Sequence, residues 1–389
     1  MSAGSPVSDS SRLPALDGLR GVAAAIVVAY HFVLATHLSD DYLRVLAGGS
    51  SDSGAVNLLA NTPVRYLIMG PEAVVVFFVL SGFVLVLPLL RGKGLDLWNY
   101  FPRRVLRLWL PSAAAVVLAV VVILATPQDP AGLPSSWAQA FSFPAPTVTD
   151  VASSFFLITG SPVLNNPLWT LRWELLFSLL LPVVFVVIAL IRRGRTAWII
   201  VCGAATGLGA LWGVPALTYG PMFLVGGILA AVFSARGQSA SPFRTWSAFV
   251  GGLVLLAVPD MVRLWTPEGA RVVLHPLSQA AVVWGAALLV LALSSSSHLS
   301  RFFSLRPFRF LGRISFSLYL VHVPLVLGAV HLLPEHPYRA LMIVAPVIFA
   351  VSWLFCRYIE EPAARLGRVA GTRTSLVVGR IADRASARP

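Results

Sequence analysis

The sequence predicts an all-α integral membrane protein, built as a bundle of about ten transmembrane helices. Its composition leads to this fold class. Apolar residues make up 57% of the 389 residues and charged residues only 12%, and the mean hydropathy is +0.81. Soluble domains are less apolar than this. The net charge of +13 does not predict nucleic-acid binding, because the basic residues alternate between loops as membrane topology requires.

Ten apolar runs are long enough to cross a bilayer. We predict spans at 18–38, 66–90, 105–125, 167–191, 197–212, 214–234, 246–264, 272–294, 311–333 and 338–360. Most basic residues then lie in loops on one side, and the opposite loops hold only Arg44, Arg65, Arg263, Arg271 and Arg339. The positive-inside rule therefore places both termini in the cytoplasm.

The two ends of the chain differ from the part between them. Residues 1–12 are rich in serine and predict a disordered cytoplasmic lead. Residues 13–366 form the transmembrane domain, and its first span is expected to stay as an uncleaved anchor. Residues 367–389 are rich in arginine, so we expect a basic, disordered cytoplasmic tail that is attracted to anionic lipid.

The first span places ionisable residues on one apolar helix. Arg20 and His31 are eleven residues apart, which puts them on one face and about 16 Å apart along the axis. Asp17 can pair with Arg20 at the helix start. An ionisable residue as deep as His31 costs a few kcal/mol and normally faces a wet cavity or the bundle interior. Alone, this segment fits a functional histidine and a packing histidine equally well.

The second and third spans carry small and basic residues. Ser81 and Gly82 predict close contact with another helix, and Glu72 at the outer end is expected to be solvated. Arg103, Arg104 and Arg107 then follow at the cytoplasmic start of the third span. They are either an ordinary positive-inside anchor or a site for the phosphates of a nucleotide-bearing donor, which arginine binds through forked hydrogen bonds.

The long outer loop at 126–166 is rich in proline and without lysine or arginine, which is typical of lids and binding elements. The fourth span then carries Arg172 and Glu174 in its outer part. Residues two apart do not face one another on a helix, so each is expected to find its partner elsewhere. Burying two opposite charges adds little stability, which favours a functional cavity here.

The fifth to eighth spans have almost no reactive side chains and predict a scaffold. The ninth span carries Ser315, Tyr319 and His322 at i, i+4 and i+7, which predicts a polar stripe on one helix face. The stripe either forms hydrogen bonds between helices or lines a cavity. His331 follows at the outer end and is expected to be solvated. Nothing in the chain has the spacing of a zinc site or a phosphate-binding loop, so no metal is predicted.

Six segments together resemble acyltransferase family 3, whose members are polytopic membrane acyltransferases. They are LDGLRGVAA with VVAYHF, then FFVLSGFVL, RRVLRLWLP, LWTLRWELLFSLLLP, LGRISFSLYLVHVP and EEP, spread over residues 13 to about 366. Arg20 and His31 match the family pattern of an arginine, ten residues and a histidine. The segment at 169–178 departs from the family's WSLSxEEQFY-type run: only Glu174 of the acidic pair is present and Arg172 is added. The acceptor pocket is therefore expected to differ.

The resemblance implies a plasma-membrane enzyme that moves an acyl group, most readily acetyl, from acyl-CoA to a hydroxyl of a carbohydrate or glycosylated small molecule. It implies that the CoA phosphates bind Arg103, Arg104 and Arg107 and that Arg20 lies on the donor side. His31 would act as general base on the acceptor hydroxyl, a role that suits its ordinary pKa. The candidate side chains for orienting His31 or binding the acceptor are Glu174, Arg172, Ser315, Tyr319 and His322.

Three alternatives stay open at this level. His31 either acts as a base or carries the acyl group itself for a time. A transporter or flippase of a glycolipid or sugar would also place Arg, Glu and His in the membrane, although no inverted repeat is visible. A degenerate scaffold is disfavoured because Arg20, His31 and the basic cluster are all present.

Overall fold

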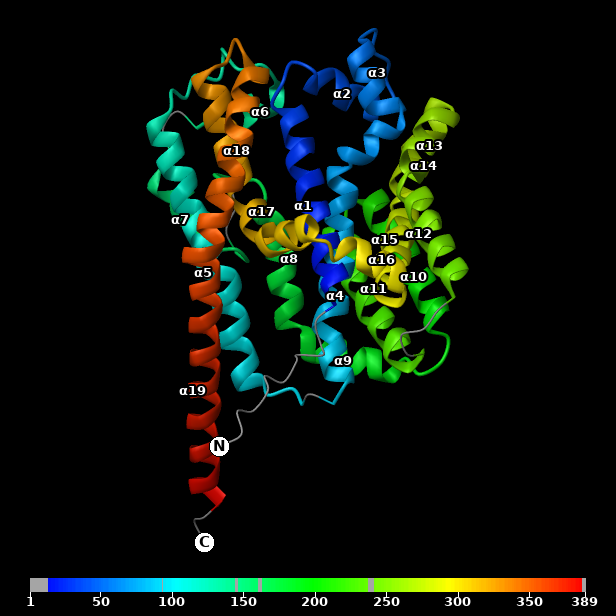
Figure 1. The fold of residues 1–389 in the computed structure, drawn as a ribbon, viewed down its shortest axis with the longest axis vertical. Coiled ribbons are helices and arrows are strands. Elements are labelled where there is room, and N and C mark those ends of the chain that lie inside the picture. The colour runs from blue at the N-terminus through cyan, green and yellow to red at the C-terminus, as the bar shows by residue number, and fades with distance from the viewer. Residues whose placement is uncertain (1–12, 93, 144–145, 160–162, 237–240, 387–389) are drawn as a thin grey trace.

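The computed structural model describes residues 13–386, except 93, 144–145, 160–162 and 237–240. Every element in the described part of the chain is helical, which confirms the predicted fold class. Among the described residues, eight helices are long and apolar enough to cross a membrane, or up to ten if each of two bent pairs is one span. Figure 1 shows these helices standing roughly side by side.

The first half of the chain supplies two central spans and the outer connections. Its elements are α1 (Pro14–Leu34), α2 (Ser39–Leu46), α3 (Gly54–Asn61), the 3-10 turn η1 (Pro63–Leu67), α4 (Gly70–Leu90), α5 (Leu97–Ala125), α6 (Ser136–Ala140), α7 (Val148–Phe155), α8 (Leu168–Leu179) and α9 (Leu181–Leu190). The short helices α2, α3 and α6 lie together at the upper end in Figure 1.

The second half supplies the scaffold and a long final helix. Its elements are α10 (Arg195–Trp212), α11 (Pro215–Arg236), α12 (Pro242–Leu256), α13 (Val258–Trp265), α14 (Glu268–Leu277), α15 (Gln279–Ser295), α16 (Ser297–Phe303), α17 (Arg306–Leu332), α18 (Pro337–Phe355), the π-helical turn η2 (Cys356–Glu360) and α19 (Glu361–Ser386). α17 is the most buried of the candidate spans and packs against α1, α18 and α5.

Two predicted spans are broken by proline. α8 and α9 meet at 63°, and α12 and α13 meet at 46°. Pro182 and Pro259 lie in the first turns of α9 and α13, where each lacks the N–H that would continue the preceding helix. A tyrosine hydroxyl donates to a carbonyl at each bend, Tyr100 to Ser178 O at 3.1 Å and Tyr66 to Leu253 O at 2.9 Å. The bends therefore keep their backbone polar groups satisfied inside the bundle.

Close packing explains Gly82 as predicted. α4 lies against α11 so closely that a side chain on Gly82 would overlap the backbone oxygen of Phe223. Such contacts between small residues are a main source of helix association in membranes.

The tail corrects the prediction of disorder at 367–389. α19 continues to Ser386, and residues 387–389 lie outside the described part of the chain. Gly367 and Gly371 lie against the backbone oxygens of Arg103 and Asn99 at the start of α5. Ser375 Oγ donates to Asp96 at 2.6 Å, and this bond, with two backbone amides of α5, holds the pKa of Asp96 below its usual range. The tail is ordered because its small residues recur every four positions and form one packing face.

Two side chains predicted to be solvated are buried. Glu72 is 7% exposed because η1 folds back and brings Arg65 Nη2 to 2.9 Å from Glu72 Oε1. His331 is 5% exposed, and its Nε2 is buried without a hydrogen-bond partner among the described residues. Glu72 and His331 lie near predicted helix ends, and this position did not reveal that the outer connections cover both side chains.

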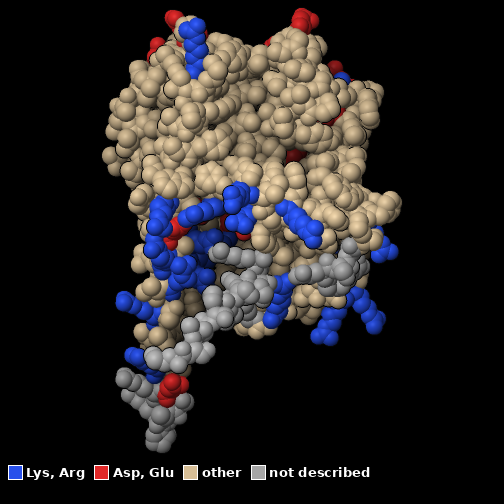
Figure 2. Space-filling model, in the orientation of Figure 1, with Lys and Arg blue, Asp and Glu red and all other residues tan. Residues whose placement is uncertain are grey.

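Charge separates the two ends of the molecule. On the face drawn in Figure 2, lysine and arginine gather in the lower half, where α5 begins and α19 ends. The upper end carries a few acidic side chains and little basic charge.

Candidate functional site

Two buried histidines from opposite ends of the chain meet inside the bundle. His31 of α1 is 8% exposed and His322 of α17 is fully buried. His322 Nε2 lies 3.2 Å from His31 Nδ1. The backbone oxygens of Val27 and Leu318 lie 2.9 and 3.0 Å from Nδ1 of His31 and His322 respectively. The predicted candidates His31 and His322 are therefore direct neighbours.

These contacts fix which nitrogens carry hydrogen in the neutral rings. A carbonyl oxygen only accepts, so Nδ1 of each histidine must donate to its backbone partner. His31 Nδ1–H then also faces the lone pair on His322 Nε2. The His31 Nε2 atom keeps its own lone pair, and no hydrogen bond to a described residue occupies it. His31 therefore has one free basic nitrogen, Nε2. His322 lies at the other nitrogen of the His31 ring, Nδ1.

Two glycines allow α1 and α17 to approach closely enough for this pairing. A side chain on Gly21 would overlap the backbone of Gly312 and Leu311, and one on Gly312 would overlap Asp17 O. Gly18 faces Phe303 O of the neighbouring helix α16 in the same way. Gly21 in LDGLRG and Gly312 in LGRIS therefore bring the two histidine-bearing helices into backbone contact.

Aromatic rings enclose the pair. The Trp137 ring of α6 lies 5.4 Å from the His31 ring, measured between centroids, and Tyr30 lies at 5.5 Å. α6 is fixed over the end of α1, because Ser135 Oγ donates to Leu34 O at 2.7 Å. The long outer loop therefore places an aromatic ring directly beside His31. Sequence reasoning missed Trp137 itself, although it singled out the loop.

The polar stripe of α17 divides into two parts. The Tyr319 hydroxyl accepts a hydrogen bond from Thr170 Oγ1 of α8 at 2.9 Å, and its ring lies 5.9 Å from that of His322. Asn165, just before α8, donates to Leu320 O at 3.0 Å. Ser315 Oγ instead donates to Gly312 O of its own helix at 2.9 Å. Tyr319 and His322 therefore belong to the histidine site, whereas the Ser315 hydroxyl is used within α17.

A second group of charged residues lies toward the basic end of the bundle. Arg104 of α5 contacts Glu174 Oε1 of α8 at 2.7 Å and Ser178 Oγ at 2.9 Å. The prediction that Glu174 finds a partner on another helix is thus confirmed. This pairing fixes Arg104, which is no longer free to bind a ligand without losing Glu174.

Arg107 differs from Arg104 because it remains free. It lies close enough to Arg104, Arg20, Glu360 and Glu174 for their charges to act on it. Its side chain stays exposed, and no hydrogen bond or ion pair joins it to a described residue. Arg20 is also only loosely held, with 3.9 Å from its Nη1 to Asp17 Oδ1. Arg20 and Arg107 are therefore available to an anionic ligand.

Glu360 completes this charged group and was missed as a site residue. It ends the π-helical turn η2, and Ser317 of α17 donates to its Oε2 at 2.7 Å. Its charge acts on Arg107 and Arg20. Single π-helical turns often occur at functional sites. The EEP segment was the available sequence signal.

The structure does not bring two predicted residues into either group. Arg172 is exposed on α8 and makes no hydrogen bond or ion pair with a described residue. Arg103 is exposed as well, on the part of α5 that packs against α19. Among the described residues no cluster of three or more His, Cys, Asp or Glu side chains has metal-binding geometry.

The comparison with known families gives one match. A model described as an acyltransferase domain, that of acyltransferase family 3, matches residues 13–357. The matched stretch contains both histidines, Arg20, Arg104, Arg107 and Glu174. No curated protein and no solved structure matches the chain.

Proposed function

The chain belongs to acyltransferase family 3, and from this premise we propose that it transfers an acyl group, most readily acetyl, from acyl-CoA to a hydroxyl of a carbohydrate or glycosylated small molecule. Its fold is that of a multi-pass membrane protein, and we place it in the plasma membrane. The free Nε2 atom of His31, on the same helix as Arg20 of the charged group, is the observation that carries the proposal.

His31 serves as the general base. As the acceptor hydroxyl oxygen attacks the thioester carbonyl, its proton passes to His31 Nε2. The C–S bond then breaks, the acyl group stays on the acceptor oxygen, and the proton on His31 passes to the leaving CoA sulfur. His322 Nε2 accepts from His31 Nδ1–H, which orients the ring and stabilises the positive charge that forms on it. Tyr319, whose hydroxyl accepts from Thr170, lies beside His322.

The charged group suits the donor's phosphates. Arg107 is exposed and makes no hydrogen bond or ion pair with a described residue, Arg20 contacts Asp17 only at 3.9 Å, and arginine binds phosphate through paired hydrogen bonds. Arg104 and Glu174 hold each other, so we assign both to positioning. Arg20 and His31 share α1, so a donor bound at Arg20 has its acyl end directed along that helix toward His31.

The test is release of free thiol from acetyl-CoA by the purified protein in the presence of sugar-bearing acceptors. We expect acceptor-dependent release by the wild type and a loss of at least about a hundredfold in His31→Ala, since general-base catalysis contributes roughly 10²–10⁴. The matched control is His298→Ala, because His298 is exposed and lies outside both groups.

Two outcomes would contradict the proposal. Equal thiol release by wild type and folded His31→Ala would exclude His31 as the base. No release from any acyl-CoA by a folded wild type would turn the interpretation toward transport, which consumes no acyl-CoA.

A further inference from the structure

Arginines are rare at the end of the molecule opposite the basic end, and most of them converge on one place. The positive-inside rule explains arginines in inner loops but none at the outer end. Arg263 of α13 and Arg271 of α14 line one cavity at the connection between α2 and α3, and Arg65 of η1 shares Asp260 with Arg263. A topological anchor would not require this convergence.

Two of these arginines form a buried, internally neutral network. Arg65 contacts Glu72 at 2.9 Å and Asp260 at 3.5 Å, and Arg263 contacts Asp260 at 3.6 Å. The side chains of Arg65 and Arg263 are only 6% and 5% exposed. Two positive and two negative groups therefore cancel, which a buried cluster requires. The network holds Arg263 in a fixed orientation.

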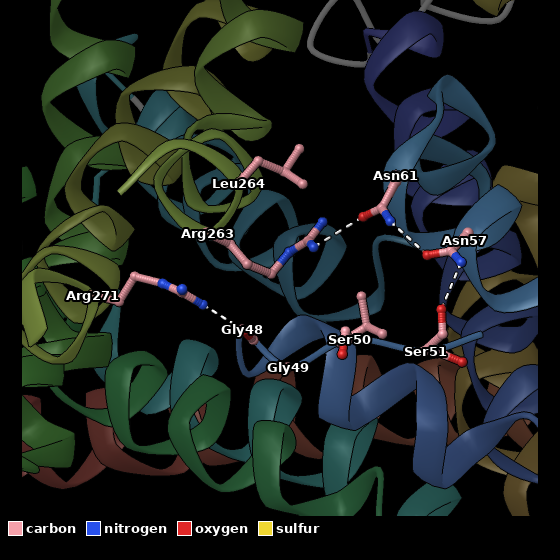
Figure 3. A pocket seen from close by; sticks show the side chains of 10 residues that line it. Gly48, Gly49, Ser50, Ser51, Asn57, Asn61, Arg263, Leu264 and Arg271 are labelled. Carbon is pink, nitrogen blue, oxygen red and sulfur yellow. Dashed lines mark hydrogen bonds between the residues drawn. The ribbon is translucent and has the colours of Figure 1, made fainter. Parts of the chain in front are cut away.

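Arg263 forms one wall of a cavity of about 280 Å³. Its lining is almost entirely polar or backbone: Val45, Gly48, Gly49, Ser50, Ser51, Asn57, Asn61, Arg263, Leu264 and Arg271. Figure 3 shows a chain of hydrogen bonds from Arg263 to Asn61, from Asn61 to Asn57 and from Asn57 to the backbone of Ser51. The wall is thus built before any ligand arrives. The volume lies near the lower end of small-molecule sites.

Arg271 adds a positive charge to the lining of this cavity. Asp41, which accepts a hydrogen bond from the lining residue Ser51, is already paired with Arg44. The Arg271 guanidinium donates to the backbone oxygens of Gly48 and Thr266, and no acidic side chain in the described chain pairs with it. Gly48 has a φ of +99°, and a side chain there would overlap Arg271 Nη1. Glycine therefore permits the contact that points Arg271 at the cavity (Figure 3). Its Nη2 group has no hydrogen bond to a described residue.

We propose that this cavity binds a small hydroxylated anion, that is, a sugar or similar polyol that carries one carboxylate or phosphate. Arg271 supplies the charge that the buried network does not cancel. Ser50, whose hydroxyl has no hydrogen-bond partner in the described chain, and the amides of Asn57 and Asn61 supply groups for hydroxyls. The site does not depend on the acyl-transfer proposal.

The test is calorimetric titration of the full-length protein in detergent with three probes: D-glucuronate, glucose 6-phosphate and neutral glucose. We expect saturable binding of at least one anionic probe, at least about tenfold tighter than glucose, since hydrogen bonds to a charged group contribute that much. Which anion binds distinguishes a carboxylate ligand from a phosphate ligand.

Four variants locate the binding. Arg271→Gln and Ser50→Glu should each weaken anion binding at least about tenfold, by removing a positive charge or adding a negative one. Ser50→Gln is the neutral control of similar size and should weaken anion binding less than Ser50→Glu, because it loses the hydroxyl without adding a negative charge. Arg339→Gln should leave binding unchanged, because this exposed outer arginine does not line the cavity.

The proposal fails if wild type binds no anionic probe, if glucose binds as tightly, or if Arg271→Gln and Ser50→Glu bind like wild type. His31→Ala should bind the anion unchanged, so a failure of acyl transfer and a failure of this site are distinguished.

Discussion

At the scale of single residues, His31 keeps one free ring nitrogen, whereas both ring nitrogens of His322 are engaged. His322 Nε2 faces His31 Nδ1 at 3.2 Å, so it cannot also take a proton from a substrate. We expect His322→Ala to lower kcat about 10- to 100-fold while KM for acyl-CoA changes little, because a positioning group is lost and the base remains. Steady-state kinetics with thiol detection measures both.

A conservative variant of His322 distinguishes a role in positioning His31 from a role in packing alone. The side-chain oxygen of His322→Gln can accept from His31 Nδ1–H, so this variant should recover much of the lost kcat. If His322→Gln is as impaired as His322→Ala, the hydrogen bond is not what His322 contributes.

Replacing Arg107 and replacing Arg104 should have different effects. We expect Arg107→Gln to raise KM for acetyl-CoA at least about tenfold, through lost contacts to phosphate. The same variant should leave turnover of a short acetyl thioester without phosphates unchanged. Arg104→Gln should instead destabilise the protein, because it leaves Glu174 without its partner.

Arg193→Gln is the matched control, since Arg193 is exposed at the same basic end and lies outside the charged group. If Arg107→Gln slows both thioesters equally, Arg107 does not recognise phosphate.

At this scale, the sequence predicts many residues of the candidate site, but it does not predict which of them pair with each other. The depth of His31 and the spacing of Tyr319 and His322 are visible in the sequence. That His31 meets His322 depends on where α1 and α17 cross. Ser315 lies on the same stripe, yet its hydroxyl bonds back to Gly312 O, a choice that periodicity cannot reveal. The Arg104–Glu174 pair joins residues 70 positions apart.

At the scale of helices, the crossing of α1 and α17 determines the geometry of the histidines. The backbones touch at Gly21 and Gly312. We expect Gly21→Ala to destabilise the protein by about 1–3 kcal/mol, as overpacking does, and to lower activity by moving His31 from His322. Thermal unfolding in detergent and thiol release measure the two effects.

Gly251→Ala is the control for helix propensity. Gly251 also lies inside a helix, but an added methyl group there would only make an ordinary contact with Leu288 at 3.7 Å. This variant should be neutral or more stable by up to about 1 kcal/mol. Equal behaviour of the two variants would mean that the α1–α17 contact is not tight.

Element boundaries were predictable where apolar length decided them, and less so elsewhere. The ten apolar runs correspond to helices, but the bends at Leu180 and Ala257 depend on prolines within runs that read as continuous. α19 was not predicted, because its packing face consists of small residues and the segment has a low apolar content. The outer helices α2 and α3 are too short to be recognised as spans, although they build the wall of the polar cavity.

At the scale of the whole molecule, the uneven charge distribution predicts orientation. Basic residues gather at the end where α5 begins and α19 ends (Figure 2), and positive loops stay in the cytoplasm. We therefore expect α19 to lie inside the cell and the polar cavity of Ser50 and Arg271 to face outside.

Single cysteines can test this orientation. Cys202 and Cys356 are buried and free, and both are first replaced by Ala. A membrane-impermeant maleimide should then label Ser50→Cys in intact cells and should label Gly379→Cys only after the membrane is opened. Both positions suit the test, because Ser50 is exposed and a side chain at Gly379 meets no atom within 4 Å. Labelling of Gly379→Cys in intact cells would invert the topology. Arg20 and Arg107 would then face away from cytoplasmic acyl-CoA, and the proposed donor site would lose its supply.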